Sequence, residues 1–283
     1  MSTLLPNHQT PSAIDQANAL RRLALDIGVS GRRAAPDRAK LAVVTSGKGG
    51  VGTTTLAVNL AVALAGRNRR TVLADAALNG GDAVRLCRIP ERFTVADVLA
   101  GRRSARDALE PGPGGIEVLP GAWGLNHAGE FPPAVQDRFV EDLTGLGSAN
   151  DWVVVDAGSG ANRMVQRLWQ AAQCVLLITT GDAAAVMNAY AAVKVLSAGK
   201  PLATIHSVVN MAADEAGAAE VHLRLARACL RFLGVRVCGA GFLPNDPYVP
   251  AAAKRQEPFV LAAPNAPAAR RIDALVEVVL GKK

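Results

Sequence analysis

The chain has 283 residues, of which 50% are hydrophobic and 19% are charged, and its formal net charge is +7. This length would allow two domains, but we expect one elaborated α/β domain with a single large core. No apolar run reaches the roughly 18 residues of a membrane span, and Asp15, Arg21 and Arg22 interrupt the stretch where a signal peptide would be apolar. These features predict a soluble, cytoplasmic protein.

The basic charge allows attraction to nucleic acid or anionic lipid, but the scarcity of aromatic residues and the spacing of the cysteines argue against a nucleic-acid-binding protein and a disulfide or zinc protein. Aromatic residues make up only 4% of the chain, too few to stack on bases between the arginines, so we expect no nucleic-acid binding. The cysteines form no C-x-x-C pair and lie far apart, at Cys87, Cys174, Cys229 and Cys238. We expect reduced thiols in a core, not disulfides or a zinc site.

The first forty residues differ from the rest of the chain in composition. They contain three prolines and the basic segment Gly31-Arg32-Arg33. Between Ser12, a suitable N-cap, and Leu25, apolar residues recur at helical spacing. We therefore predict a flexible leader of residues 1–39 with a short helix, followed by a domain of residues 40–283.

From Lys40 onward, short β-branched runs alternate with helical patterns. Strands are predicted at residues 41–45, 71–74, 116–119, 152–155, 174–179, 204–209 and 237–243, and helices lie between them, including 54–65, 183–197 and 214–233. Several strands lack polar alternation, as strands buried on both faces do. The pattern predicts a doubly wound, mostly parallel sheet flanked by helices.

A glycine-rich loop, Gly47-Lys48-Gly49-Gly50-Val51-Gly52, joins the first strand to the first helix of this domain. Ligands of such sheets bind beyond the carboxyl ends of the strands, and a helix N-terminus attracts phosphate. The loop also satisfies G-x-G-x-x-G, and Asp75 ends the next strand, so a nicotinamide enzyme is an alternative. Lys48 and the hydroxyls of Thr54 and Thr55 favour a P-loop with Mg²⁺ instead.

A second acidic strand end supports the P-loop interpretation. Asp156 follows the apolar run Trp152-Val153-Val154-Val155 and precedes Gly158, an arrangement that holds Mg²⁺ and its water in P-loop proteins. A helix-capping aspartate is the alternative for this residue taken alone.

These residues resemble the MinD/ParA family, whose deviant Walker A motif is K-G-G-x-G-K-[ST]. Other segments resemble the FlhG or FleN branch of that family, which regulates flagellar number: 179–182, 188–190 with Lys194, 208–210, 241–247, 255–259 and 263–270. In the leader, Asp15-Gln16-Ala17-Asn18-Ala19-Leu20-Arg21 is similar to the D-Q-A-x-x-L-R segment with which FlhG proteins stimulate the GTPase FlhF.

The resemblance implies a MinD-like P-loop fold in which two subunits sandwich ATP. Lys48 would be the catalytic candidate, reaching the phosphates of the neighbouring subunit. The implied nucleotide-binding residues are Gly47, Lys48, Gly49, Gly50, Val51, Gly52, Thr53, Thr54, Thr55, Asn210, Pro244 and Asp246, and the implied Mg²⁺ residues are Thr54, Asp75 and Asp156. Asp15, Gln16, Leu20 and Arg21 would bind an FlhF-type GTPase.

Two positions depart from the family pattern. Thr53 stands where the family has its P-loop lysine, and Ala77 replaces the second aspartate of D-x-D, which positions the attacking water. Losing a charged hydrogen bond worth about 1.5–3 kcal/mol weakens binding about ten- to a hundredfold. Both losses are expected to slow ATP hydrolysis. Asp82 lies close enough in sequence to replace the aspartate, and the Thr53 hydroxyl could still bind phosphate.

We therefore expect a regulator of flagellar number or placement with a degenerate ATP site, binding ATP or ADP with Mg²⁺ weakly. Two alternatives remain open: a working ATPase switch that uses Lys48, and a DNA-partition or pilus-localising relative. Expected partners are an FlhF-type GTPase, flagellar basal-body or regulatory proteins, and a second copy or an active paralogue. The apolar residues of 272–280 predict a last core helix, so any recruitment to the inner face of the membrane would be indirect.

Overall fold

The computed structural model describes residues 38–77, 82–122, 131–198 and 203–281. The predicted helix at residues 12–25 and the leader residues Asp15, Gln16, Leu20 and Arg21 lie outside these ranges.

The described strands form one sheet in the order β3-β4-β2-β5-β1-β6-β7-β8. Their bounds are β1 (Lys40–Ser46), β2 (Thr71–Asp75), β3 (Glu110–Pro111), β4 (Glu117–Leu119), β5 (Trp152–Ser159), β6 (Cys174–Thr179), β7 (Thr204–Ala212) and β8 (Val237–Pro244). Every neighbouring pair is parallel except β3 with β4. This confirms the predicted sheet, and only β3 is additional, because two residues are too short to show a periodic pattern.

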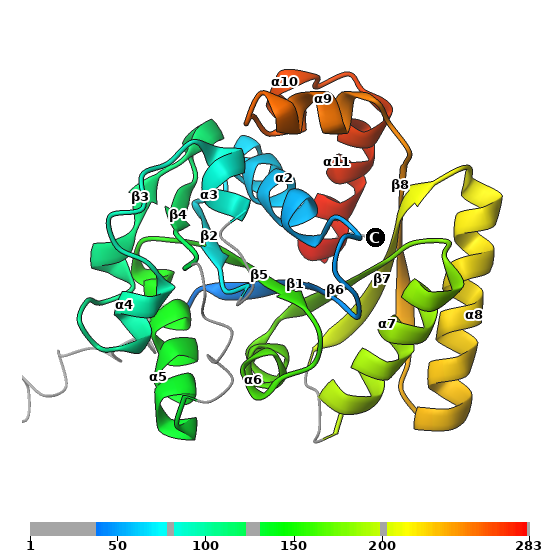
Figure 1. The fold of residues 1–283 in the computed structure, drawn as a ribbon, viewed down its shortest axis with the longest axis horizontal. Helices are drawn as coiled ribbons and strands as arrows, with labels where there is room; N and C mark the ends of the chain where they lie inside the picture. The colour runs from blue at the N-terminus through cyan, green and yellow to red at the C-terminus, as the bar shows by residue number, and fades with distance from the viewer. Residues whose placement is uncertain (1–37, 78–81, 123–130, 199–202, 282–283) are drawn as a thin grey trace, which may run out of the picture. The chain divides into compact units, whose positions relative to one another are not determined.

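Helices cover both faces of the sheet (Figure 1). One face carries α2 (Thr53–Gly66), α3 (Asp82–Cys87), α9 (Tyr248–Lys254), α10 (Phe259–Ala262) and α11 (Pro267–Val279). The other carries α4 (Val95–Leu99), α5 (Pro133–Thr144), α6 (Arg163–Ala171), α7 (Ala183–Leu196) and α8 (Glu215–Leu233). Short 3-10 turns lie at Arg106–Ala108, Pro113–Gly115 and Gly145–Ser148.

Local sequence signals set the ends of the helices on the second face. Asn162, Asp182 and Asp214 each accept a backbone hydrogen bond at the start of α6, α7 and α8. These are the side chains that best satisfy the free N–H groups of a first turn. Gly234, with a φ of 67°, ends α8 in the left-handed conformation that glycine adopts without strain.

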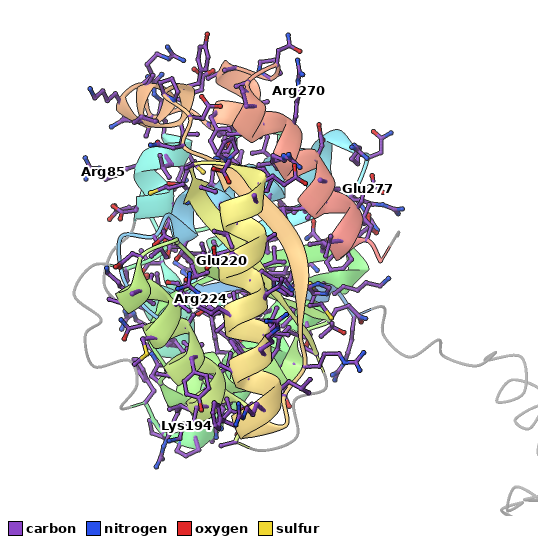
Figure 2. The ribbon with its side chains drawn as sticks, turned by 90° about the vertical axis from the view of Figure 1, so that its right-hand side faces the viewer. Arg85, Lys194, Glu220, Arg224, Arg270 and Glu277 are labelled. Carbon is purple, nitrogen blue, oxygen red and sulfur yellow. The ribbon has the colours of Figure 1, made fainter. Side chains whose placement is uncertain are left out.

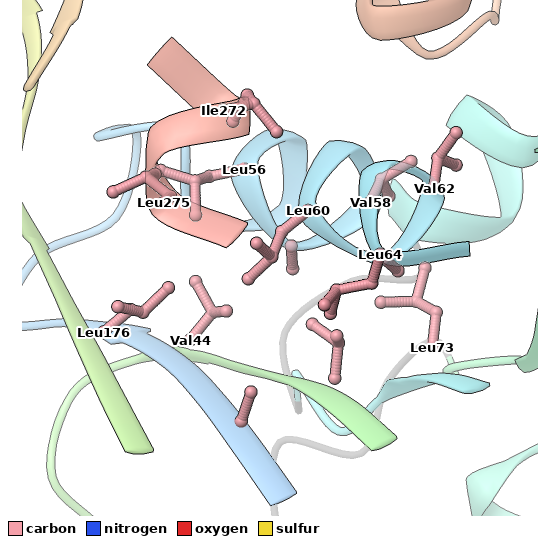
Figure 3. Packing of buried hydrophobic residues seen from close by; sticks show 14 of the residues in the cluster. Val44, Leu56, Val58, Leu60, Val62, Leu64, Leu73, Leu176, Ile272 and Leu275 are labelled. Atoms are coloured by element: carbon pink, nitrogen blue, oxygen red, sulfur yellow. The ribbon is translucent and has the colours of Figure 1, made fainter. Parts of the chain in front are cut away.

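The core lies between the sheet and its two helical layers. Leu56, Leu60 and Leu64 of α2 lie above Val44 of β1 and Leu73 of β2, and α11 packs beside them (Figure 3). Each fully buried leucine stabilises the fold by about 1.5–3 kcal/mol relative to an exposed one. Burial on both faces explains why the central strands read as continuous apolar runs.

The C-terminal helix α11 packs into this core, as its apolar spacing predicts. Ile272, Leu275, Val276 and Val279 are all buried. In the part of the chain that the structure describes, no helix has the length and hydropathy needed to span a membrane.

The order of the strands reverses at β1, which pairs with β5 on one side and β6 on the other. A crevice at such a switch point is where open α/β sheets bind ligands. The loop of residues 47–52 follows β1 directly.

Candidate functional site

The loop between β1 and α2 passes very close to two other segments. At Gly47, a Cβ atom would lie 2.1 Å from the backbone carbonyl of Asn188 in α7. At Gly52, where φ is 89°, a Cβ atom would lie 2.3 Å from the amide nitrogen of Asn210. Glycine is required at both positions, because any side chain would clash and the second conformation is strained for other residues.

The loop leaves the start of α2 open to an anion. Gly52 precedes the helix and offers no side-chain cap. The N–H groups of a first helical turn have no partner within the helix, and the helix dipole is positive at this end. The local backbone is therefore suited to bind phosphate.

A cavity of about 740 Å³ borders this loop, within the roughly 300–1,000 Å³ typical of ligand pockets. Among the residues predicted to bind nucleotide, those that line it are Gly49, Gly50, Gly52, Thr53, Thr54 and Thr55. Those that do not line it are Gly47, Lys48, Val51, Asn210, Pro244 and Asp246.

Thr53 uses its hydroxyl inside the loop. The side chain is 8% exposed, and its Oγ1 donates to Oγ of Ser46 at 2.9 Å. Ser46 in turn donates to the carbonyl oxygen of Lys48 at 2.9 Å. The proton of the Thr53 hydroxyl is therefore engaged with protein, where a lysine would direct its ammonium at phosphate.

Lys48 turns away from the cavity toward α7. Its Nζ lies 2.9 Å from Oδ2 of Asp182, and both side chains are about half exposed, at 45% and 50%. Asp182 also accepts hydrogen bonds from the N–H groups of Ala184 and Ala185. Because both charges are solvated, this ion pair is weak.

Asp75 ends β2, whereas its register partner Asp156 lies inside β5, which continues to Ser159 beyond the predicted strand end. One oxygen of each accepts a backbone N–H, from Ala77 at 3.2 Å and from Gly158 at 3.0 Å. Within the described residues, the Oδ2 atom of each carboxyl is buried without a hydrogen-bond partner. Such orphaned oxygens are uncommon in protein interiors and fit a cation or a proton.

Burial raises the pKa of both carboxyls. Burial raises the pKa of Asp156 from 3.8 to about 6, and this rise is opposed by the nearby Thr54 hydroxyl and by the hydrogen bond from the Gly158 N–H. Desolvation, followed by the charge of Asp156, raises the pKa of Asp75 well above its usual value. A cation beside the pair would favour the ionised forms.

The donor set fits Mg²⁺ only in part. The carboxyl oxygens and the Thr54 hydroxyl are the hard ligands that this ion prefers. No group of three or more His, Cys, Asp or Glu side chains able to hold a metal occurs among the described residues. Mg²⁺ would therefore depend on water and ligand phosphates for its remaining positions, which is its usual mode of binding.

Two of the residues predicted to bind nucleotide form hydrogen bonds with the backbone instead. Nδ2 of Asn210 donates to the carbonyl oxygen of Val51 at 2.8 Å, which ties β7 to the loop. Asp246 is 4% exposed, and its two oxygens accept the N–H groups of Tyr248 and Ala268, each at 2.9 Å. These bonds hold the loop, α9 and α11 in place.

The position of the missing aspartate and its possible substitute both border the cavity. Ala77 and Asp82 both line it, and Asp82 begins α3. Asp82 therefore borders the same space as the missing carboxylate, although it follows by five positions in sequence.

The cavity also contains residues that carry no sequence prediction. Ser159 ends β5 and Asn162 caps α6, Met211 and Gln256 stand at left-handed backbone positions, and Arg85 comes from α3. Arg85 is the only cation among the described residues that line the cavity. An isolated arginine in a short helix has no motif or spacing that would reveal it.

Comparison with known proteins agrees with this architecture. Residues 42–259 match the family model of the CobQ/CobB/MinD/ParA nucleotide binding domain. The chain is 32% identical over 236 residues to the antiactivator FleN of Pseudomonas aeruginosa, covering 83% of this chain and 84% of FleN. It is 28% identical over 176 residues to the flagellum site-determining protein YlxH of Helicobacter pylori, covering 62% and 59% of the two chains.

Among solved structures, the MinC:MinD cell division complex of Aquifex aeolicus contains a similar chain. The TM-score is 0.68 at 25% identity, and the match covers 87% of this chain and 97% of that one. With FleN and YlxH among its relatives, this chain belongs to the MinD/ParA family of nucleotide-binding domains, in its FlhG/FleN branch.

Proposed function

We propose that this protein regulates flagellar number or placement through partner proteins, and that it binds ATP or ADP with Mg²⁺ weakly and hydrolyses ATP poorly or not at all. The likeness to YlxH, a flagellum site-determining protein, supports the flagellar role, and the likeness to the antiactivator FleN supports a regulatory one. One observation carries the degenerate site: the loop directs no cationic side chain into the cavity, since Thr53 bonds to Ser46 and Lys48 pairs with Asp182.

This arrangement lowers affinity and slows turnover for the same reason. Phosphate oxygens would meet backbone N–H groups without a charged side chain from the loop. A hydrogen bond to a charged group is worth about 1.5–3 kcal/mol, or roughly ten- to a hundredfold in affinity. Charge that develops in the transition state would also lack stabilisation, and Ala77 cannot orient the attacking water.

Restoring the two lost groups tests the proposal. We expect the double variant Thr53→Lys with Ala77→Asp to bind ATP at least tenfold more tightly than the natural protein and to hydrolyse it much faster. Thr53→Met is the matched control, because it has a side chain of similar length without the charge. ATP affinity is measured by calorimetry and turnover by phosphate release.

The alternative is an active ATP switch that depends on Lys48. It predicts that the natural protein already hydrolyses ATP at a rate comparable with active relatives and that Lys48→Ala abolishes this activity. That result would replace the degenerate-site proposal. A restored double variant with unchanged turnover would likewise contradict it.

The leader is the proposed contact for an FlhF-type GTPase, through Asp15, Gln16, Leu20 and Arg21. We expect Gln16→Ala to abolish stimulation of GTP hydrolysis by the purified partner, whereas Asn18→Ala, at a variable position of D-Q-A-x-x-L-R, should leave it intact. Partner binding that survives deletion of residues 1–25 would overturn this assignment. Nucleotide binding by the domain provides the check that the variants are folded.

Further proposed partners are flagellar basal-body or regulatory proteins, a second copy of the chain, and an active paralogue. In a mixed dimer, Lys48 could serve the paralogue's nucleotide, because its ammonium is exposed and, in the part of the chain that the structure describes, bonded only to an exposed carboxylate. Membrane recruitment would then occur through these partners. Sedimentation with and without ATP distinguishes the assemblies.

A further inference from the structure

Arg85 is a charged side chain at the cavity that has no bonding partner within the described ranges. It lines the cavity from α3, is exposed, and makes no hydrogen bond or ion pair with the described residues. Figure 2 shows its side chain extending from α3 at the edge of the molecule. A long side chain in this position can move its guanidinium without breaking any contact.

The backbone that carries Arg85 is firmly held, in contrast to its side chain. Val84 and Cys87 are buried in the same core cluster as α2. The guanidinium of Arg88 donates to the carbonyl oxygen of Arg255, which joins the end of α3 to the end of α9. The Arg85 Cα atom therefore has a fixed place beside the cavity.

The acidic groups around the cavity favour the binding of a cation there. Its wall carries the carboxylate of Asp82, and Asp75 and Asp156 lie buried behind it. A polyphosphate would bring further negative charge into this space. Mg²⁺ can neutralise part of that charge, but the loop supplies no side-chain cation, because Thr53 replaces lysine and Lys48 faces α7.

We infer that Arg85 binds the β- or γ-phosphate of the nucleotide and replaces the charge lost at Thr53. A planar guanidinium donates two parallel hydrogen bonds to phosphate, a geometry that lysine cannot reproduce. The inference rests on the proposed nucleotide site and adds a residue to it. It also gives α3 a direct contact with the distal phosphates, which AMP lacks.

Calorimetric titration of the full chain with ATP, ADP and AMP in Mg²⁺ buffer tests this role. We expect Arg85→Ala to weaken ATP and ADP binding about ten- to a hundredfold and AMP binding much less, since AMP lacks the distal phosphates. Arg85→Lys should recover part of the affinity. Arg92→Ala, an exposed arginine that does not line the cavity, is the matched control and should bind like the natural protein.

A double-mutant cycle tests whether Arg85 and a lysine introduced at position 53 neutralise the same phosphate charge. If they do, Arg85→Ala should weaken binding several-fold less in the Thr53→Lys background than in the natural chain. If the natural protein binds ATP and Arg85→Ala binds it equally well, Arg85 has no such role and the proposed site stands without it. If the natural protein binds no nucleotide at millimolar concentration, the proposed site itself is wrong. Thermal unfolding confirms that each variant is folded.

Discussion

Replacing the Asp156 carboxyl by an amide should stabilise the metal-free protein at neutral pH. Asp156 is completely buried, and one of its oxygens has no hydrogen-bond partner in the part of the chain that the structure describes. The variant Asp156→Asn keeps the shape of the side chain and an oxygen that accepts the Gly158 N–H. It removes the negative charge, which burial disfavours.

The displaced pKa of Asp156 gives the size of the effect. The folded-state pKa of about 6 lies above the ordinary value of 3.8, so the folded protein binds the proton more tightly than the unfolded chain. The free energy of unfolding therefore falls as the pH rises from about 4 to 6. At about 1.36 kcal/mol for each pKa unit, the total loss is about 3 kcal/mol at pH 7.

Urea unfolding of the full chain in EDTA buffer measures this difference. At pH 7, Asp156→Asn should raise the free energy of unfolding by up to about 3 kcal/mol, and near pH 4 the two proteins should be almost equally stable. Asp246→Asn is the opposing control. Both oxygens of Asp246 accept N–H groups, so the amide loses a bond and costs about 1–3 kcal/mol.

Equal stabilities of Asp156→Asn and the natural chain across this pH range would refute the reasoning. So would a lower stability of the variant at pH 7, because it would mean that the carboxylate is already compensated in the metal-free protein.

Three further predictions concern the glycine-rich loop. Gly47→Ala should lose about 1–3 kcal/mol of stability and most nucleotide binding, because its Cβ would lie 2.1 Å from the backbone of α7. Gly181→Ala is the control and should be tolerated, since its Cβ would have nothing within 4 Å. Equal unfolding midpoints for these two variants would contradict the prediction. Asp182→Asn retains the cap of α7 and frees Lys48, so chemical denaturation should show a change below about 1 kcal/mol. Asn210→Ala should cost about 1 kcal/mol in the same assay and increase hydrogen exchange in the loop; unchanged exchange would show that its bond to the loop is dispensable.

The sheet was predictable because its signals are local. Runs such as Leu41-Ala42-Val43-Val44 have no polar residue to face solvent, and in the structure they are buried on both faces. The caps Asp182 and Asp214 likewise mark the starts of α7 and α8 in the sequence itself. The short strand β3 escaped prediction, since it forms only against β4.

The contacts of the candidate site were less predictable because they join distant segments. Lys48 and Asp182 are 134 residues apart, and no local pattern pairs them. The resemblance implied a nucleotide contact for Asp246, yet its oxygens accept N–H groups from the first turns of α9 and α11. Arg85 reaches the cavity only because the packing of α3 on α2 brings it there.

The pairing of Lys48 with Asp182 makes the loop sensitive to its medium. The N–H groups of Ala184 and Ala185 hold the aspartate in place whether or not the lysine is present, so separation of the pair leaves α7 intact. Dissolved salt screens an attraction between two half-exposed charges. Raising the ionic strength can therefore separate Lys48 from Asp182 and leave its ammonium available to a neighbouring molecule, without any bound ligand.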